Sequence, residues 1–250
     1  MNVNLQHRVA LVTGAARGIG KAIADCLSEN GATVYRADIS PESPLLMDVT
    51  NAAQIAEALA QIEREQGRLD ILINNAGINT LAHRVNIDAF PQAEWDRILA
   101  VDLTGVYQVS RAAIPLLRLA PSDGRRIVNI ASVAGLVPLR LQCAFTAAKA
   151  GVINLTKAMA LELGPESILV NAIAPGSILT KGTEQLFYGE NGLFKDSVQR
   201  LLDHIPLGRP GAPEEIAHAA LFLVAPESSY INGHCLTVDG GWTAGYHREF

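Results

Sequence analysis

A short glycine-rich segment near the start of the chain has the composition of a phosphate-binding turn. Its sequence is Thr13-Gly14-Ala15-Ala16-Arg17-Gly18-Ile19-Gly20. It follows an apolar run and precedes apolar residues at helical spacing, so it joins a predicted strand to a predicted helix. Glycines there let the backbone approach a pyrophosphate, whose charge meets the free N–H groups at the helix start. Taken alone, the segment is also compatible with a simple tight bend.

A carboxylate supplies a second signal for a nucleotide. Asp38 closes the next apolar run, 18 residues after Gly20. In a dinucleotide-binding fold, a carboxylate near this position accepts hydrogen bonds from the ribose hydroxyls of the adenosine half. The turn and the carboxylate reinforce each other, and together they favour a dinucleotide as the ligand.

The elements that must position these residues alternate between apolar runs and helical patterns. The predicted strands are residues 8–13, 32–38, 45–49, 69–74, 126–131, 168–174 and 235–238. The predicted helices are residues 19–30, 55–62, 95–119, 142–163 and 213–224. This alternation predicts a Rossmann-type α/β fold, a doubly wound parallel sheet of about seven strands with helices on both faces. With 250 residues and 49% hydrophobic side chains, we expect a single domain over residues 1–250.

The connection between the second and third predicted strands is unusual. Residues 39–44 alone separate them, and Pro41 and Pro44 forbid a regular helix there. Six extended residues reach about 20 Å, which is enough to return along a strand of typical length. We therefore expect an extended crossover to an adjacent edge strand.

Further motifs follow several of the predicted strands. They are Asp48-Val49, Asn74-Asn75-Ala76-Gly77, Ser132, Pro175-Gly176 and Val238-Asp239-Gly240-Gly241. Together with the glycine-rich turn, they make the chain resemble the short-chain dehydrogenases/reductases almost from end to end. That resemblance implies an oxidoreductase that transfers a hydride between a nicotinamide cofactor and a small alcohol or carbonyl compound.

The resemblance also implies which residues hold the cofactor. Asp48 and its neighbour match positions that hold the adenine, and the backbone of residues 75–77 lines the cofactor. Ile178 and Thr180 match positions that hold the nicotinamide carboxamide. The expected cofactor-binding residues are Gly14, Arg17, Gly18, Ile19, Gly20, Asp38, Asp48, Val49, Asn75, Ala76, Gly77, Lys149, Pro175, Gly176, Ile178 and Thr180.

Two residues disagree about the choice between NAD and NADP. Arg17 lies beside Gly18, where relatives that prefer NADP often carry a basic residue. Asp38 favours the opposite choice, because a 2′-phosphate against a carboxylate brings like charges into contact. Arg17 can instead lie in solvent or touch the phosphates. We therefore expect NAD, with NADP as the less favoured cofactor.

Family members use a serine, a tyrosine and a lysine for catalysis, and an asparagine that supports a water relay. Ser132 and Lys149 match the serine and the lysine, and Lys149 is also expected to bind the nicotinamide ribose. The tyrosine position holds Phe145, four residues before Lys149 on the same helix face, and a phenyl ring has no proton to give. The asparagine position holds Asp102, which can anchor water but adds a charge. The expected catalytic residues are Ser132, Phe145, Lys149 and Asp102, without a metal.

Losing general acid–base catalysis costs about 10² to 10⁴ in rate, so we expect cofactor binding with impaired turnover. Three explanations of Phe145 stay open. Phe145 is a deliberate replacement of a natural tyrosine that traps bound substrate, or it is natural and another group moves the proton, or the chain has lost the chemistry. His83 and Tyr188 are the candidate replacements. Phe145 and Asp102 together motivate a rival from another class, a catalytically silent NAD-binding sensor or scaffold.

The segment that caps the substrate in relatives is residues 179–194, and here it is mixed and polar. Its polar residues include Lys181, Glu184, Tyr188, Glu190 and Asn191. Arg140 and Gln142, just before Phe145, are expected at the same pocket. A sugar, polyol or hydroxy/oxo acid is the favoured substrate. Reduction of 3-oxoacyl chains is the alternative, which Asp38 disfavours because such reductases usually take NADP.

Composition and charge exclude several classes of partner. The chain has 20 Lys and Arg against 25 Asp and Glu, a net charge of −5 without a long run of either sign. We therefore expect neither nucleic acid nor a membrane as a partner. No apolar stretch reaches the ~18 residues of a membrane span, and the start lacks a signal-peptide profile, so a cytoplasmic protein is expected.

Cysteine spacing and the long helices predict a reduced, self-associating protein. Cys26, Cys143 and Cys235 are odd in number and lack metal-ligand spacing, so we expect reduced thiols. Relatives are often tetramers that associate through helices matching residues 103–119 and 142–163 and through the last strand and helix. A homo-oligomer, a tetramer or a dimer, is therefore expected.

Overall fold

The computed structural model describes residues 3–80, 83–180, 198 and 202–245. The strands are β1 (Val9–Thr13), β2 (Thr33–Asp38), β3 (Leu45–Leu46), β4 (Ile71–Asn74), β5 (Arg126–Ile130), β6 (Leu169–Pro175) and β7 (Cys235–Val238). The regular helices are α1 (Gly18–Glu29), α2 (Ala52–Gln66), α3 (Gln92–Leu99), α4 (Gly105–Leu119), α5 (Cys143–Leu163) and α8 (Pro213–Val224).

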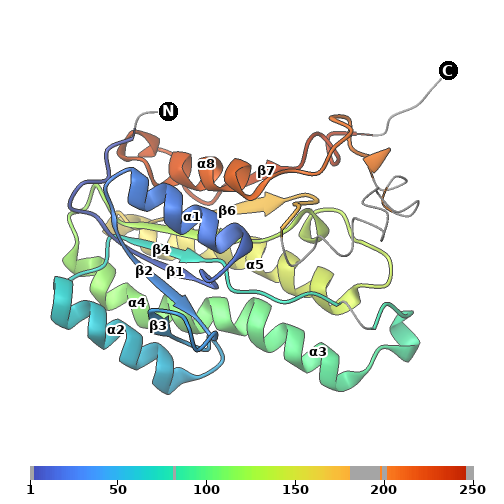
Figure 1. Ribbon diagram of the computed structural model, residues 1–250, viewed down its shortest axis with the longest axis horizontal. Helices are drawn as coiled ribbons and strands as arrows, with labels where there is room; N and C mark the ends of the chain where they lie inside the picture. The colour runs from blue at the N-terminus through green and yellow to red at the C-terminus, as the bar shows by residue number, and fades with distance from the viewer. Residues whose placement is uncertain (1–2, 81–82, 181–197, 199–201, 246–250) are drawn as a thin grey trace.

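These strands form one seven-stranded sheet in the order β3-β2-β1-β4-β5-β6-β7, and every neighbouring pair is parallel. Figure 1 shows the sheet between two layers of helices, with α1 and α8 on one face and α2, α4 and α5 on the other. The predicted doubly wound parallel sheet is confirmed. Its strand order changes direction between β1 and β4, the place where open α/β sheets bind ligands.

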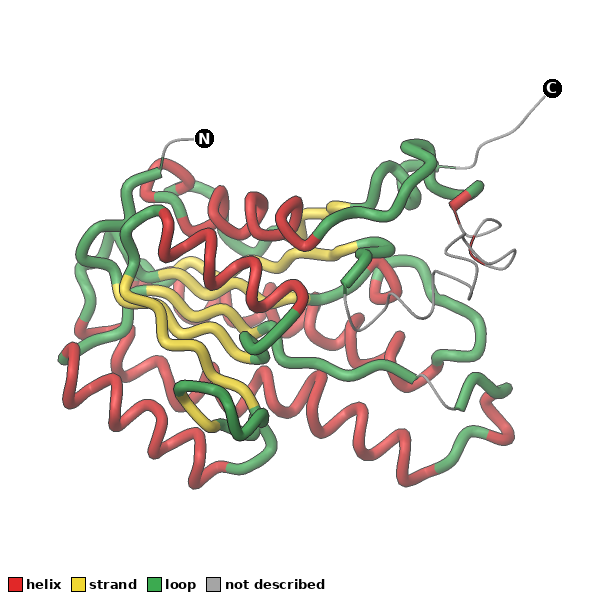
Figure 2. The backbone as a smooth tube through the Cα atoms, in the orientation of Figure 1, coloured by secondary structure: helices red, strands yellow, loops and turns green. Residues whose placement is uncertain are grey.

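Alternation along the strands builds a separate apolar core on each face of the sheet. In β1, Ala10 and Val12 pack toward α1 and α8, whereas Val9 and Leu11 pack toward α2 and α4. Figure 2 shows the strands side by side, with the loops that leave their carboxyl ends gathered at one edge of the sheet. Both cores therefore hold the strand ends rigidly behind that edge.

Two predicted elements differ from the structure. The third strand was expected over residues 45–49, but its pairing ends at Leu46, opposite Asp38. The chain turns there because the carboxylate of Asp48 accepts hydrogen bonds from the backbone N–H and the hydroxyl of Thr50, both at 2.8 Å. Such a side-chain turn competes with further strand pairing.

The helix expected over residues 95–119 is interrupted. It begins earlier, at Gln92, and residues Ala100–Thr104 form a π-helical turn between α3 and α4. One extra residue per turn rotates the side chains that follow, and π-turns of this kind occur frequently at functional sites. This turn contains Asp102.

Candidate active site

A cleft of about 1290 Å³ lies at the carboxyl ends of the strands. Every residue predicted to bind the cofactor or to take part in catalysis lines it. These residues are Gly14, Arg17, Gly18, Ile19, Gly20, Asp38, Asp48, Val49, Asn75, Ala76, Gly77, Asp102, Ser132, Phe145, Lys149, Pro175, Gly176, Ile178 and Thr180. Arg140 and Gln142 line the same cleft. The fold therefore collects residues from loops and helices that are far apart in the sequence into one space.

The glycine-rich turn is tied to the loop after β4. The hydroxyl oxygen of Thr13 accepts hydrogen bonds from the N–H groups of Asn75, at 3.0 Å, and Ala76, at 2.9 Å. The Asn75 amide donates in return to the backbone oxygens of Thr13 and Gly14. A Cβ at Gly20 would lie 2.2 Å from the Gly14 oxygen and 2.3 Å from the Asn75 amide nitrogen. Glycine is required there because two backbone segments meet.

The start of α1 has the free donors that an anion needs. Arg17 occupies the N-cap position, but no side chain caps the helix and no acidic residue lies in its first turn. The first N–H groups of a helix have no partner within the helix, and the helix dipole favours negative charge there. This cradle fits the pyrophosphate of a dinucleotide.

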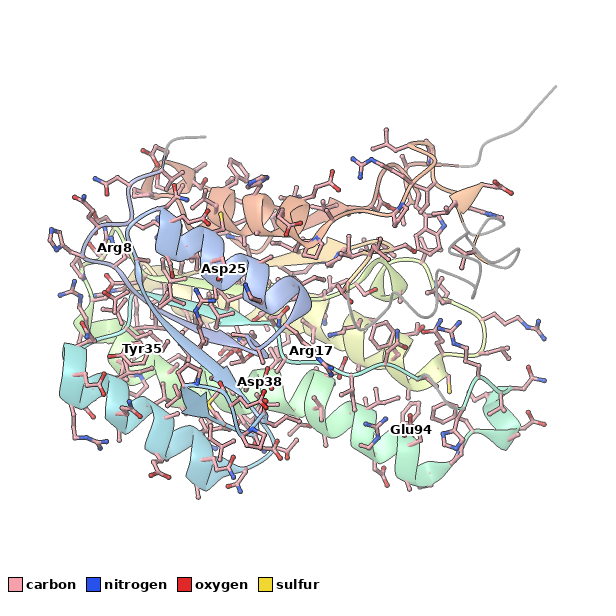
Figure 3. The ribbon with its side chains drawn as sticks, in the orientation of Figure 1. Arg8, Arg17, Asp25, Tyr35, Asp38 and Glu94 are labelled. Atoms are coloured by element: carbon pink, nitrogen blue, oxygen red, sulfur yellow. The ribbon has the colours of Figure 1, made fainter. Side chains whose placement is uncertain are left out.

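Asp38 is held at the end of β2 against the same turn. One carboxylate oxygen accepts a hydrogen bond from the N–H of Ala16 and the other from the N–H of Ser40, both at 3.0 Å. Figure 3 shows Asp38 close to Arg17, whose side chain is exposed. The carboxylate thus has a fixed orientation at the rim of the cleft.

A buried ion pair lies deeper in the cleft. Lys149 of α5 and Asp102 of the π-turn approach to 3.1 Å, and their side chains are 6% and 0% exposed. The second oxygen of Asp102 accepts a hydrogen bond from the N–H of Ile78 at 2.8 Å, and the Lys149 ammonium donates to the backbone oxygen of Ile130 at 3.2 Å. The π-turn thus directs Asp102 inward, between the loops after β4 and β5.

The Phe145 ring lies beside this ion pair. Its centroid is 5.6 Å from the Lys149 nitrogen, within the range of a cation–π contact. Ser132 follows β5, and its hydroxyl oxygen accepts a hydrogen bond from the N–H of Ala134 at 3.1 Å. Serine, lysine and an aromatic ring therefore lie in one cleft, but the ring has no hydroxyl group.

The structure places one of the two candidate replacements for a tyrosine hydroxyl group and does not describe the other. His83 is exposed and does not line the cleft. Tyr188 lies outside the described residues, together with Lys181, Glu184, Glu190 and Asn191.

Sequence reasoning missed several residues that line the cleft. They are Asn79, Arg84, Arg97, Leu139, Val198 and Trp242. Arg97 lies on α3, where an arginine that follows a glutamate by three residues has the pattern of a solvent-facing ion pair. Its neighbours in space come from elements far apart in the sequence, so spacing alone gave no signal.

No group of three His, Cys, Asp or Glu side chains in the described part of the chain could hold a metal ion, and no described helix is long and apolar enough to cross a membrane. The three cysteines are free. Burial raises the pKa of the Cys235 thiol to about 11, so this thiol stays protonated at neutral pH.

Comparison with known proteins decides the family. A family model described as enoyl-(acyl carrier protein) reductase matches residues 14–243. The chain belongs to the short-chain dehydrogenase/reductase family. Within it, the chain is 38% identical to a 3-oxoacyl-[acyl-carrier-protein] reductase of Thermotoga maritima, over 96% of this chain and 99% of the relative.

Other relatives in the family have different names. The chain is 36% identical to an NAD-dependent glycerol dehydrogenase of Listeria innocua, over 96% of this chain and 95% of the relative. The solved structure of an aldohexose dehydrogenase of Thermoplasma acidophilum matches with a TM-score of 0.88 and 33% identity, over 98% of each chain. The family therefore makes this chain an oxidoreductase by type, and its relatives include both acyl reductases and sugar or polyol dehydrogenases.

Proposed function

We propose that this protein binds NAD(H) and transfers a hydride between it and a small polar alcohol or carbonyl compound, slowly in the present sequence because Phe145 replaces the family tyrosine. The observation that carries the proposal is the joint placement of Asp38, the glycine-rich turn, Ser132 and Lys149 around one cleft. When bound, the nicotinamide ring supplies or accepts the hydride. The protein supplies position and charge.

Each part of the cleft has a defined task in this proposal. The helix start at Arg17 binds the pyrophosphate, and Asp38 accepts hydrogen bonds from the adenosine ribose hydroxyls. Lys149 binds the nicotinamide ribose, and Ser132 donates a hydrogen bond to the substrate oxygen. Holding the reacting groups together in this way contributes to rate without a proton donor.

Asp38 supports NAD over NADP, and binding tests this part of the proposal. A 2′-phosphate next to its fixed carboxylate meets a like charge, so NADH should bind about tenfold or more tightly than NADPH. Fluorescence titration of the protein with each reduced cofactor measures the ratio. Asp38→Ala should narrow it. Equal or tighter binding of NADPH by the unmodified protein would refute the choice of NAD.

A second candidate activity is reduction of 3-oxoacyl thioesters. It is favoured by the relative named as a 3-oxoacyl-[acyl-carrier-protein] reductase. The two activities are separated by a rate comparison in the Phe145→Tyr variant, with NADH and NADPH, between a small polyol or hydroxy acid and a 3-oxoacyl thioester. Faster use of the thioester would replace our proposal with this one.

The competing hypothesis is that the protein catalyses no reaction and serves as an NAD-binding sensor or scaffold. It predicts tight NADH binding and no turnover, even after Phe145→Tyr. Turnover of any substrate in the panel by that variant, at a rate well above the cofactor's reaction in buffer, argues against it. Tight binding without turnover in either protein would support it.

The proposal includes a symmetric homo-oligomer, a tetramer or a dimer, in the cytoplasm. Large apolar side chains are exposed on α4 and α5, with Tyr107 at 48% and Leu161 at 81%. Near the end of α8, Phe222 is 38% exposed and Tyr230 is fully exposed. Apolar faces of this kind become buried when copies associate by symmetry. Sedimentation velocity at micromolar concentration should show an oligomer, and a monomer would refute this part.

A further inference from the structure

The cleft has two ends with different charged groups. At the adenosine end, the lining contains Asp38 before β3, Asp48 after β3, and Arg17. At the other end, beyond the residues assigned to the cofactor, the described lining contains Arg84, Arg97 and Arg140. Besides Asp38 and Asp48, the one acidic residue in the described lining is Asp102, and it is paired with Lys149. The net charge of the whole chain is −5, so the positive charge at this end of the cleft is opposite in sign to that of the protein.

The Arg97 guanidinium is held at the cleft by an ion pair. Its Nε and one Nη donate to the Glu94 carboxylate, both at 2.9 Å. Those hydrogen bonds, with a smaller contribution from the charge of Asp102, raise the pKa of Arg97, so its guanidinium stays charged where it lines the cleft. Figure 3 shows Glu94 on α3, well separated from Asp38 and Arg17. An arginine has five N–H donors, and Glu94 uses two of them.

The other two arginines approach from separate loops. Arg84, after β4, donates through Nε to the backbone oxygen of Thr80 at 3.4 Å, which leaves its two Nη groups without a partner among the described residues. Arg140, just before α5, has no carboxylate partner in the described part of the chain. A guanidinium presents paired donors that match a carboxylate or phosphate. Arg84 and Arg140 therefore present free donors at the cleft, and Arg97 adds the N–H groups that Glu94 leaves unused, so the three form an oxyanion-binding set.

Gln142 gives an independent sign of a ligand at this end. It is 6% exposed and lines the cleft, but its side-chain oxygen has no hydrogen-bond partner in the described structure. It stands at the N-cap position of α5 without capping the helix. A buried amide without a partner costs free energy unless a ligand or water pairs with it. A hydroxyl group on the substrate is a suitable partner.

From these positions we propose that the substrate is a small hydroxylated anion, whose carboxylate or phosphate group is bound by Arg84, Arg97 and Arg140 and whose hydroxyl group pairs with Gln142. This inference rests on the proposed function, because it places the anion next to the nicotinamide end of the cleft. It narrows the substrate from polar compounds in general to oxyanions.

The first test uses inorganic phosphate as the probe and needs no turnover. Calorimetric titration is carried out on the protein saturated with NADH, so that the pyrophosphate site is occupied. Phosphate should bind, and Arg84→Gln with Arg140→Gln should weaken it tenfold or more. Arg64→Gln, an exposed arginine on α2 outside the cleft, is the matched control and should change nothing. No binding of phosphate, or equal binding by the double variant, overturns the proposal.

The second test separates the sources of the oxyanion. D-gluconate, D-sorbitol 6-phosphate and D-sorbitol are titrated into the same NADH complex, since they share a polyol chain and carry a carboxylate, a phosphate and no charged group. The two anions should bind about tenfold or more tightly than sorbitol, and the tighter one identifies carboxylate or phosphate as the preferred group. Equal binding of sorbitol overturns the proposal. The proposal is also overturned if the variant with Arg84→Gln and Arg140→Gln binds both anions normally and is impaired with a 3-oxoacyl thioester on an acidic carrier protein alone.

Failure of this inference is distinguishable from failure of the proposed function. If NADH itself does not bind, the proposed function is wrong. If NADH binds normally but the anions show no preference over sorbitol, the arginine cluster is a solvated surface and the inference alone is wrong.

Discussion

The adenosine end and the catalytic end of the cleft are built in different ways. At the adenosine end, backbone groups and short polar side chains bind one another, as Thr13 does with Asn75 and Asp38 with Ala16. At the catalytic end, long side chains from separate elements meet, as Lys149 does with Asp102. The first kind of construction fixes the shape of the backbone, so replacing one side chain that projects from it changes that shape little. The second depends on each side chain, and in our proposal two of its four residues, Phe145 and Asp102, replace the tyrosine and asparagine expected from the family resemblance. Binding and chemistry should therefore be separable by mutation.

The largest expected effect is at the catalytic end. Phe145→Tyr places a phenol one helical turn before Lys149, whose charge favours the phenolate, so turnover on the right substrate should rise about 10²-fold or more. Affinity for NADH should change little, because the ring position stays filled. Steady-state rates and NADH fluorescence titration measure the two quantities.

The contrary outcome for this variant is equally clear. If the unmodified protein turns over efficiently and Phe145→Tyr is no faster, another group moves the proton. His83→Ala and Tyr188→Phe are then the variants to compare. Loss of NADH affinity in Phe145→Tyr would show that the two ends are not separable.

A smaller effect is expected at the adenosine end from Gly20→Ala. The added Cβ would meet the Gly14 oxygen at 2.2 Å, so backbone must move. Overpacking of this kind costs about 1–3 kcal/mol, and if that cost falls on the bound state, NADH should bind about 5- to 150-fold more weakly. When Gly20→Ala is combined with Phe145→Tyr, the maximal rate at saturating cofactor should equal that of Phe145→Tyr alone.

Gly245→Ala is the matched control, because nothing lies within 4 Å of its added Cβ. Thermal unfolding of Gly20→Ala distinguishes a local defect from general loss of structure. Unchanged NADH affinity in a folded Gly20→Ala protein would show that the turn does not bind the pyrophosphate.

The same contrast explains what could be predicted from the sequence. The strands and the glycine-rich turn are local patterns, and the structure has them where apolar runs and turn residues indicated, except that the third strand ends early, at Leu46. The residues expected to bind the cofactor or to catalyse the reaction all line one cleft, since parallel strands bring their carboxyl ends to one edge, whereas the candidate replacement His83 does not. The roles of those residues stay predictions. The π-turn at Ala100–Thr104 escaped prediction because helical periodicity tolerates one extra residue, and the contacts that favour it are with Ile78 and Lys149.

The smallest expected effect tests the charge of Asp102. Its carboxylate lies 3.1 Å from the Lys149 nitrogen and is fully buried, so it offsets the positive charge that an introduced phenol at position 145 would use. Adding Asp102→Asn to Phe145→Tyr should therefore lower the pKa of that phenol and raise the rate at neutral pH about three- to tenfold. The matched comparison is Asp102→Asn alone, which should gain nothing because no phenol is present.

The pH profile decides what Asp102 does. If the ion pair restrains the phenol electrostatically, the rise of rate with pH should move to lower pH in the double variant relative to Phe145→Tyr, since the phenolate then forms more easily. If Asp102 serves instead to position Lys149 and the loop at Ile78, Asp102→Asn should lower the rate at every pH and weaken NADH binding as well. A double variant with a lower rate, unchanged NADH affinity and an unshifted pH profile would contradict the electrostatic argument. The Asp102 carboxylate would then take part in moving the substrate's proton.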